Sequence, residues 1–376
     1  MRQFRVATDI RYGHDSLSSL RQLAGQRVLI VTDSFMTRTK VMELVLRELG
    51  QAQVTVFDQV SPNPDVDTVV AGLERYAAAQ PDAIVALGGG SPIDAAKAIH
   101  SIALRQGADL RSGFIVIPTT SGSGSEGTSY AVISDHASQS KIPLTSDDMI
   151  PNVAILDPEA VRTAPPKLTA DSGMDAVSHA IEAYVAVGHS DFSDAFAEKA
   201  LQLLCVNLPV AFENPDNLQA RERVHNAACM AGLAFENAGL GIVHSISHSI
   251  GGVFPMAHGR LNSMILPHVI EFNAGALGFG PGALTPVGRR YAHLGLMVDV
   301  KATTPRGRVL GLIEDCRKLA ARLKMPVRLS DAGIAKDEFL RAVPKLAHAA
   351  LNDRCTVGNP VPVDVHDLEA ILMKIA

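Results

Sequence analysis

The chain has 376 residues, so two domains are expected, because single hydrophobic cores stop growing at roughly 250–300 residues. The hydrophobic fraction of 47%, the formal net charge of −5 and the absence of tryptophan describe an ordinary globular protein and argue against nucleic acid or an anionic membrane as partner. The four cysteines have no CxxC spacing, and the N-terminus has no signal-peptide pattern, which favours a reducing cytoplasm over secretion or a membrane.

The first part of the chain alternates short apolar runs with amphipathic stretches. We predict buried strands at 27–32, 53–57, 82–87 and 113–117, with helices at 37–50, 65–79 and 92–105. Val/Ile-rich runs separated by helices are typical of a parallel sheet that is covered on both faces. This pattern predicts an N-terminal, Rossmann-like, doubly wound α/β domain over residues 1–164.

The apolar spacing changes at a breaker cluster, Ala-Pro-Pro-Lys at 164–167. After it, the spacing is mostly helical, for example in 171–186, 190–212 and 219–237, and a stretch rich in Gly and Pro at 273–287 predicts a loop. We therefore predict that residues 165–376 form an all-helical second domain.

A glycine-rich segment follows the third predicted strand, which ends at Leu87. Its three glycines allow close approach of a ligand, Ser91 is predicted to cap the next helix, and Pro92 suits the first turn. The N–H groups at such a helix start suit a pyrophosphate. The alternative is a tight strand-to-helix turn without a ligand.

Two further segments extend the candidate nucleotide site. No GxGxxG follows the first strand, which ends instead at Asp33, an acid that can bind ribose hydroxyls and repel a 2′-phosphate. Asp33 thereby favours NAD over NADP, although it could equally be a turn or cap acid. The hydroxyl-rich segment 118–128 suits phosphates or the nicotinamide, and its alternative is a plain connection.

Ligand-type residues for a metal gather in the second half of the chain. Asp175 and His179 are four residues apart, as are His244 and His248, and His258 follows shortly after. A spacing of four places both residues on one helix face, so spacing alone favours His244 and His248 as a ligand pair. A single histidine is more often structural, but a cluster of imidazoles with a carboxylate suits Fe(II) or Zn(II).

Seven motifs resemble those of one family, the iron-containing (group III) alcohol dehydrogenases, in the family's order. They are GGGSPIDAAKAI (88–99), IPTTSGSGSE (117–126), AILDPE (154–159), GMDAVSHAIEAY (173–184), AGLGIVHSISHSIGG (238–252), AHGRLNSMILPHVIEFN (257–273) and ALNDRCTVGNP (350–360). Within the family, the chain resembles in particular the lactaldehyde/propanediol oxidoreductases and the propanol or ethanol dehydrogenases.

The resemblance implies a role for each matching residue. It implies four metal ligands, Asp175, His179, His244 and His258, and a proton-relay role for His248 beside the nicotinamide. The implied cofactor contacts are Gly89, Gly90, Ser91, Asp94, Thr119, Thr120, Ser123 and Lys141, in addition to Asp33. Phe235 and Cys355 match positions that line the substrate pocket.

The resemblance also implies an architecture and an activity. The architecture is that of dehydroquinate synthase-like enzymes, with NAD(H) and one divalent metal as cofactors, Fe(II) favoured and Zn(II) as the alternative. The activity is the interconversion of short primary alcohols and aldehydes, with aldehyde reduction as the cellular direction. A cytoplasmic homodimer or larger homo-oligomer is expected, with a bacterial microcompartment as the alternative location.

The sequence leaves four rival functions open. A dehydroquinate-synthase-like lyase would need Lys and Arg beside the ligands, and the blocks 173–184 and 235–259 contain none. A glycerol-type polyol dehydrogenase would use the same ligands, whereas the maleylacetate reductase type normally lacks the full set of one acid and three histidines. A non-catalytic nucleotide or metal sensor would be excluded by turnover of any simple aldehyde.

Overall fold

A computed structural model gives the fold of residues 3–135, 140–275 and 284–376. The chain divides into two compact units. We call Arg5–Pro165 with Pro215–Gly232 the α/β unit, and Met1–Phe4, Pro166–Asn214 and Leu233–Ala376 the helical unit.

The α/β unit is built on a six-stranded sheet whose paired strands are all parallel, in the order β1-β8-β5-β4-β2-β3. Its strands are β1 (Asp9–Tyr12), β2 (Arg27–Val31), β3 (Gln53–Phe57), β4 (Ala83–Gly88), β5 (Gly113–Pro118) and β8 (Val153–Leu156). Its helices in this part of the chain are α1 (Lys40–Leu49), α2 (Val66–Ala79), α3 (Gly90–Arg105) and the short α4 (Pro158–Val161). The predicted doubly wound α/β domain is confirmed.

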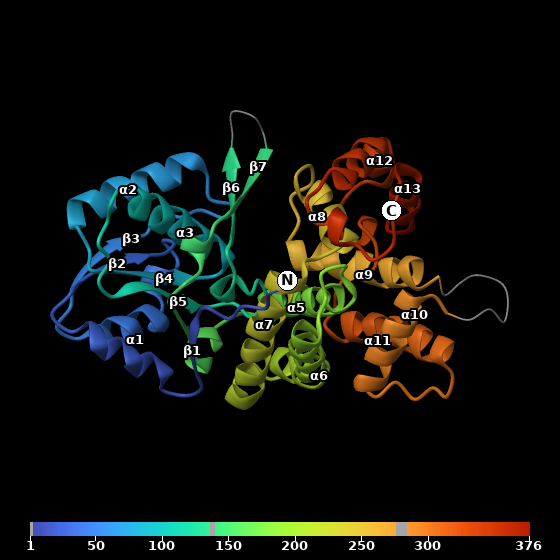
Figure 1. Cartoon of the computed structure of the whole chain (residues 1–376), viewed down its shortest axis with the longest axis horizontal. Helices are drawn as coiled ribbons and strands as arrows, with labels where there is room; N and C mark the ends of the chain where they lie inside the picture. Colours follow the sequence, from blue (N-terminus) through green and yellow to red (C-terminus); the bar gives the residue numbers. More distant parts are fainter. Residues whose placement is uncertain (1–2, 136–139, 276–283) are drawn as a thin grey trace. The chain divides into compact units, whose positions relative to one another are not determined.

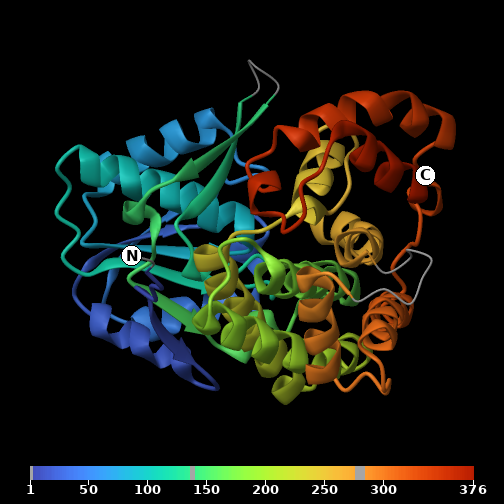
Figure 2. The same cartoon turned by 45° about the vertical axis from the view of Figure 1, so that its right-hand side comes forward.

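Alternate residues of each strand enter two separate cores, as the two-residue period of a strand requires. Val28 and Ile30 of β2 pack with α1 on one face, whereas Leu29 and Val31 pack with α2 and α3 on the other. The helices on both faces of the sheet can be followed in two views (Figure 1, Figure 2). Burial on both faces explains why these strands are almost wholly apolar.

Four strands were not predicted as such. β1 and β8 pair with each other and extend the sheet beyond β5. The strands β6 (Tyr130–Asp135) and β7 (Ser140–Thr145) form a separate antiparallel hairpin. β1 and β8 have only four residues each, which is too short for a periodic signal, and their pairing joins distant parts of the chain.

The helical unit contains the remaining long helices. They are α5 (Pro166–Val185), α6 (Asp191–Glu213), α8 (Ile242–Gly251), α9 (His258–Ala274), α10 (Pro286–Met297), α11 (Pro305–Arg322), α12 (Lys336–Leu351) and α13 (Val365–Lys374), and α7 (Leu218–Ala238) ends in this unit. The predicted breaker at 164–167 marks the start of α5, and part of the predicted loop at 273–287 lies outside the described residues. By length and composition alone, α6 could cross a membrane, but it packs against α5, and core helices commonly have this composition.

Helix α7 is divided between the two units. Its residues up to Gly232 group with the sheet, although the sequence assigned 219–237 to the helical domain. The predicted domains, 1–164 and 165–376, remain a prediction.

Candidate active site

The candidate metal ligands of the helical unit converge on one oxygen atom, Oδ1 of Asp175. The Nε2 atoms of His258, His244 and His179 lie 3.7, 3.8 and 3.9 Å from it. The ligand atoms of Asp175, His244 and His258 also lie within 4.8 Å of one another. These distances are too long for hydrogen bonds and slightly exceed the separation of roughly 3.3–3.6 Å between two ligands on one tetrahedral ion.

Three helices bring these ligands together. Asp175 and His179 are one turn apart on α5, His244 lies in the first turn of α8, and His258 is the first residue of α9. The ring of His179 stacks on that of His244, with centroids 4.6 Å apart. The side chains of His179 and His244 are 6% and 2% exposed, whereas that of His258 is 37% exposed, so the cluster is accessible on the His258 side.

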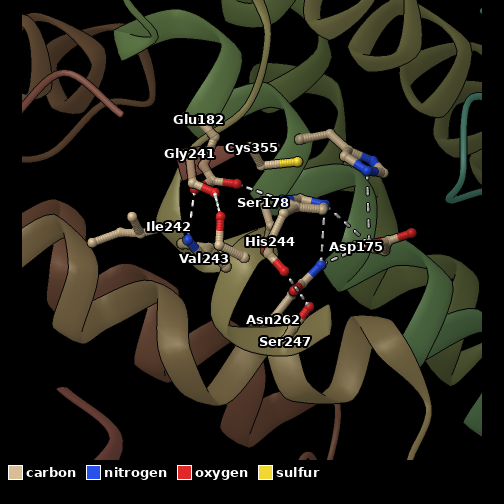
Figure 3. A network of polar contacts seen from close by, with 12 residues as sticks. Asp175, Ser178, Glu182, Gly241, Ile242, Val243, His244, Ser247, Asn262 and Cys355 are labelled. Atoms are coloured by element: carbon tan, nitrogen blue, oxygen red, sulfur yellow. Dashed lines mark hydrogen bonds and ion pairs between the residues drawn. The ribbon is translucent and has the colours of Figure 1, made fainter. Parts of the chain in front are cut away.

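Glu182 fixes the orientation of His244. One carboxylate oxygen contacts Nδ1 of His244, and the other accepts a hydrogen bond of 2.8 Å from the backbone N–H of Val243 (Figure 3). Burial raises the pKa of Glu182 to about 8, against backbone hydrogen bonds at the start of α8 that lower it. Burial, followed by the three neighbouring histidines, lowers the pKa of His244. Glu182 thus holds Nδ1 of His244, and Nε2 of the same ring faces Asp175.

Two more polar contacts support the cluster, and neither was predicted from the sequence. Asn262 Nδ2 donates to Asp175 Oδ1 at 2.8 Å and lies 3.3 Å from Nε2 of His244 (Figure 3). Ser247 Oγ lies 2.9 Å from Nδ1 of His258. The Nδ1 atoms of His244 and His258 thus both have partners outside the cluster, which turns both Nε2 atoms inward.

A divalent metal fits this arrangement. Three imidazole nitrogens and one carboxylate oxygen are a donor set for Fe(II) or Zn(II), and ligating histidines typically have their second nitrogen hydrogen-bonded in this way. The ligand set remains a prediction, and binding measurements on variants can test it.

His248 stacks on His258, with ring centroids 5.1 Å apart, and is paired with an acid outside the four candidate ligands. Its Nδ1 lies 3.0 Å from Oδ2 of Asp353, whose other oxygen accepts the N–H of Cys355 at 2.8 Å. Burial tends to raise the pKa of Asp353, but the hydrogen bonds from His248 and Cys355 outweigh it and hold this pKa at about 2. Spacing alone favoured His244 and His248 as a ligand pair, whereas the contact with Asp353 supports the relay role that the resemblance implies for His248. Both assignments remain predictions.

Asp353 is a functional candidate that the sequence reasoning missed. It is the only acid in the motif 350–360, two positions before Cys355, so the motif itself contained the signal.

Of the two predicted pocket residues, Phe235 has its ring centroid 4.5 Å from that of His179. Cys355 is partly buried, and burial raises the pKa of its thiol well above the ordinary value. Both predicted pocket residues thus lie in the neighbourhood of the ligand cluster.

Most of the predicted cofactor residues follow the carboxyl ends of β2, β4 and β5 in the α/β unit. A Cβ added at Gly89 would lie 3.1 Å from Cγ2 of Thr120, and one at Gly90 would lie 3.6 Å from Cβ of Ser123. The N–H of Thr119 donates to the carbonyl of Gly88 at 2.9 Å. The glycine-rich turn and the hydroxyl-rich loop, 119–124, are therefore adjacent.

One detail of the glycine-rich turn was predicted wrongly. The N-cap of α3 is Gly89, with no side-chain cap, and Ser91 lies in the first turn, where its Oγ accepts the N–H of Asn63 at 3.3 Å. The extended backbone of Gly89 starts the helix earlier than the serine signal indicated. The first-turn N–H groups are consequently not capped by a side chain, as a site for a phosphate requires.

The other cofactor candidates have structural partners as well. Oδ1 of Asp33 accepts the N–H groups of Phe35 and Met36, each at 2.9 Å, which is a turn-acid role. Asp94 accepts Ser125 Oγ and the N–H of Val132, each at 3.0 Å. Lys141 lies on β7, but its side chain is outside the described residues.

Comparison with known proteins agrees with this geometry. Residues 7–158 match the description "Iron-containing alcohol dehydrogenase", and residues 169–376 match "Fe-containing alcohol dehydrogenase family, C-terminal". The chain belongs to the iron-containing alcohol dehydrogenase family. It is therefore an oxidoreductase of alcohols and aldehydes, and the family uses a nicotinamide cofactor and iron.

Individual members of the family are similar over their whole length. The chain is 37% identical to the NADPH-dependent butanol dehydrogenase of Clostridium saccharobutylicum, covering 99% of this chain and 97% of that one. It is also 37% identical to the 1-propanol dehydrogenase PduQ of Citrobacter freundii, over all of both chains. The crystal structure of a 1,3-propanediol oxidoreductase has a TM-score of 0.91 and 30% identity, with both chains fully covered.

Proposed function

We propose that this iron-containing alcohol dehydrogenase reduces short primary aldehydes, of the propanal, acetaldehyde and lactaldehyde class, with NADH. The observation that carries the proposal is the convergence of three imidazole Nε2 atoms on Oδ1 of Asp175 at 3.7–3.9 Å. Asp175, His179, His244 and His258 would hold one Fe(II), and Zn(II) suits the same donors.

A divalent metal bound there supplies Lewis acidity, which favours the build-up of negative charge on the substrate oxygen during hydride transfer. His248 is suited to the proton transfer. Asp353 holds Nδ1, so Nε2 is the atom that would pass a proton to the aldehyde oxygen, and bound NADH would supply the hydride for the carbon. The products are the alcohol and NAD⁺. Asp353 is a positioning residue that keeps the ring in this orientation.

The α/β unit supports the choice of a dinucleotide. The uncapped start of α3 and the adjacent loop 119–124 suit a diphosphate. The hydrogen bonds that Asp33 accepts both use Oδ1, which leaves Oδ2 for a ribose hydroxyl and supports NADH over NADPH. Because one relative is NADPH-dependent, this preference needs direct comparison of the two cofactors.

The residues beside the ligand cluster support a small substrate. Phe235 packs against His179, and Cys355 is the only cysteine in the motif that also contributes Asp353. An aromatic ring and a protonated thiol favour a short alkyl chain over a phosphorylated or acidic group. Two relatives are named as a butanol dehydrogenase and a 1-propanol dehydrogenase, which agrees with a short primary alcohol or aldehyde as substrate.

The test is oxidation of NADH with propanal by anaerobically purified protein, with and without a chelator and added Fe(II). We expect activity that the chelator removes and Fe(II) restores, and a lower activity with NADPH. Bound Fe(II) and bound NADH without turnover of propanal would contradict the proposed substrate class, and glycerol and phosphorylated acids would then be tried.

We also propose a cytoplasmic homo-oligomer, with packaging in a bacterial microcompartment as the narrower possibility. Both rest on family membership. Light scattering of the purified chain would test the oligomer, and a single monomeric mass would contradict it. Fractionation of the source cells would test the location.

A further inference from the structure

A buried histidine lies behind the hydroxyl-rich loop of the α/β unit. His225 on α7 has no exposed surface, and its Nδ1 lies 3.0 Å from Oγ of Ser121. Its Nε2 is buried and has no hydrogen-bond partner within the described parts of the chain. An imidazole is costly to bury in this way, and an apolar side chain would fill the space without that cost. The contact with Ser121 is therefore the feature that a histidine adds here.

Helix α7 packs closely against the loop. A Cβ added at Gly124 would lie 2.5 Å from Cα of Gly232 and 3.2 Å from the carbonyl oxygen of Ala228. Because Gly124 has φ of +63°, the loop backbone itself is also restricted. His225 thus contacts the loop from a helix whose backbone packs directly against it.

The orphan nitrogen decides which way the hydrogen bond runs. A proton on Nε2 would be a buried donor without an acceptor, and orphaned N–H groups are rarer than orphaned acceptors. The proton therefore belongs on Nδ1, and burial lowers the pKa of His225 to about 3, which keeps the ring neutral. His225 then donates to Ser121, and the Ser121 hydroxyl must direct its own proton elsewhere.

Ser121 lies in the loop that adjoins the glycine-rich turn of the candidate cofactor site. Ser121 is partly exposed and follows Thr120, whose methyl group faces Gly89 in the glycine-rich turn. Within the described residues, the hydrogen bond to His225 is the one that Ser121 makes. A hydroxyl that already accepts one hydrogen bond from a fixed donor keeps its own proton for another partner, and an anionic oxygen is a suitable acceptor.

We propose that His225 is a positioning residue of the cofactor site, which orients the Ser121 hydroxyl as a donor to the diphosphate of the dinucleotide. This rests on the proposed use of a dinucleotide but not on the proposed aldehyde or metal. From the sequence, His225 has no predicted role, and Ser121 is included only as part of the hydroxyl-rich segment 118–128.

The experiment measures the Kd of the full-length, metal-loaded enzyme for NADH and for ADP-ribose, which carries the diphosphate without the nicotinamide. Ser121→Ala and His225→Leu should each raise both Kd values about tenfold, as expected for one lost hydrogen bond to a charged group. The double variant should lose no more than either single variant, because both remove the same interaction. The KM for NADH should rise with the Kd, by a larger factor than any fall in kcat.

Two variants separate positioning from simple loss of packing. His225→Asn keeps an N–H donor near the place of Nδ1 and should restore the Kd to within about threefold of the parent. His100→Leu is a matched control, since His100 is also a buried histidine of the α/β unit, but its Nδ1 contacts the carbonyl of Asp148. It should leave both Kd values unchanged.

Several results would overturn the proposal. The first is an unchanged Kd for ADP-ribose in His225→Leu, or a parent enzyme that does not bind ADP-ribose at all. The second is a double variant whose Kd rises by the product of the two single effects. The third is a rise in Kd in His100→Leu as large as that in His225→Leu. Tight binding of NADH without reduction of propanal would instead count against the proposed substrate, and would leave the comparison of these variants valid.

Discussion

Replacing Gly259 with alanine should disable the candidate metal centre without changing any ligand. Gly259 follows His258 at the start of α9, where the helix passes close to α5. An added Cβ would lie 1.8 Å from the carbonyl oxygen of Asp171 and 2.9 Å from Cβ of Asp175. A normal contact between carbon and oxygen is about 3.3 Å, so the two helices must separate by roughly 1.5 Å.

The neighbouring residues resist this separation. Arg260 forms two hydrogen bonds of 3.0 Å with the carboxylate of Asp171, which joins α9 to α5 one residue after the glycine. Metal–ligand distances tolerate changes of only about 0.2 Å, so a shift of this size should detach His258 from an ion held by Asp175. We expect Fe(II) affinity to fall at least roughly 100-fold, and the free energy of unfolding to fall by about 1–3 kcal/mol from overpacking.

The assay is competition for Fe(II) with a chelator of known affinity, together with urea unfolding of the metal-free protein. Gly251→Ala is the control, because a Cβ there would meet Leu261 Cδ1 at an ordinary 3.7 Å. A Gly259→Ala protein that binds Fe(II) as tightly as the parent would refute the reasoning, since it would show that the contact between α9 and α5 does not set the ligand geometry.

Three other changes have expected outcomes. Glu182→Ala should weaken Fe(II) binding by about 10–100-fold, because His244 loses its partner, and Glu182→Gln should weaken it by a smaller factor. Equal Fe(II) affinity in the parent and both variants would contradict this. Asp353→Asn should keep the metal and lower kcat at least roughly tenfold, because Asp353 holds Nδ1 of His248. Ser245→Ala is the control, since Ser245 contacts the other oxygen of Asp353. Loss of metal in Asp353→Asn would contradict the assigned role. Burial raises the pKa of Glu126 from 4.5 to about 7, so the folded state holds this proton more tightly than the unfolded chain does. The free energy of unfolding should therefore fall by of order 3 kcal/mol between about pH 4.5 and 7, and Glu126→Gln should flatten this slope in urea titrations; an unchanged slope would count against it.

Local sequence patterns predicted the central strands and most long helices, because burial on both faces leaves a strong signal. The predicted strand 53–57 and the helix 219–237, for example, agree with the structure to within one residue at each end. Patterns did not predict that α7 groups largely with the sheet, because this depends on packing between segments that are distant in the chain.

The candidate site likewise contains features that local sequence patterns predicted and features that depend on packing in space. Spacing indicated that His244 and His248 share a helix, but the rotation of α8 relative to α5 decides which ring faces Asp175. Only the resemblance to a family separated these roles. The supporting contacts of Asn262 and Asp353 were missed because an amide in an apolar helix and an acid in a loop have no distinctive spacing.

The most direct test of the central claim is the Fe(II) content and propanal-dependent NADH oxidation of His258→Ala beside His248→Ala, both purified anaerobically. The assignment predicts that His258→Ala loses metal and activity together, whereas His248→Ala keeps one Fe(II) per chain and turns over more slowly. A fully active His258→Ala enzyme without metal, or a metal-free His248→Ala enzyme, would contradict it.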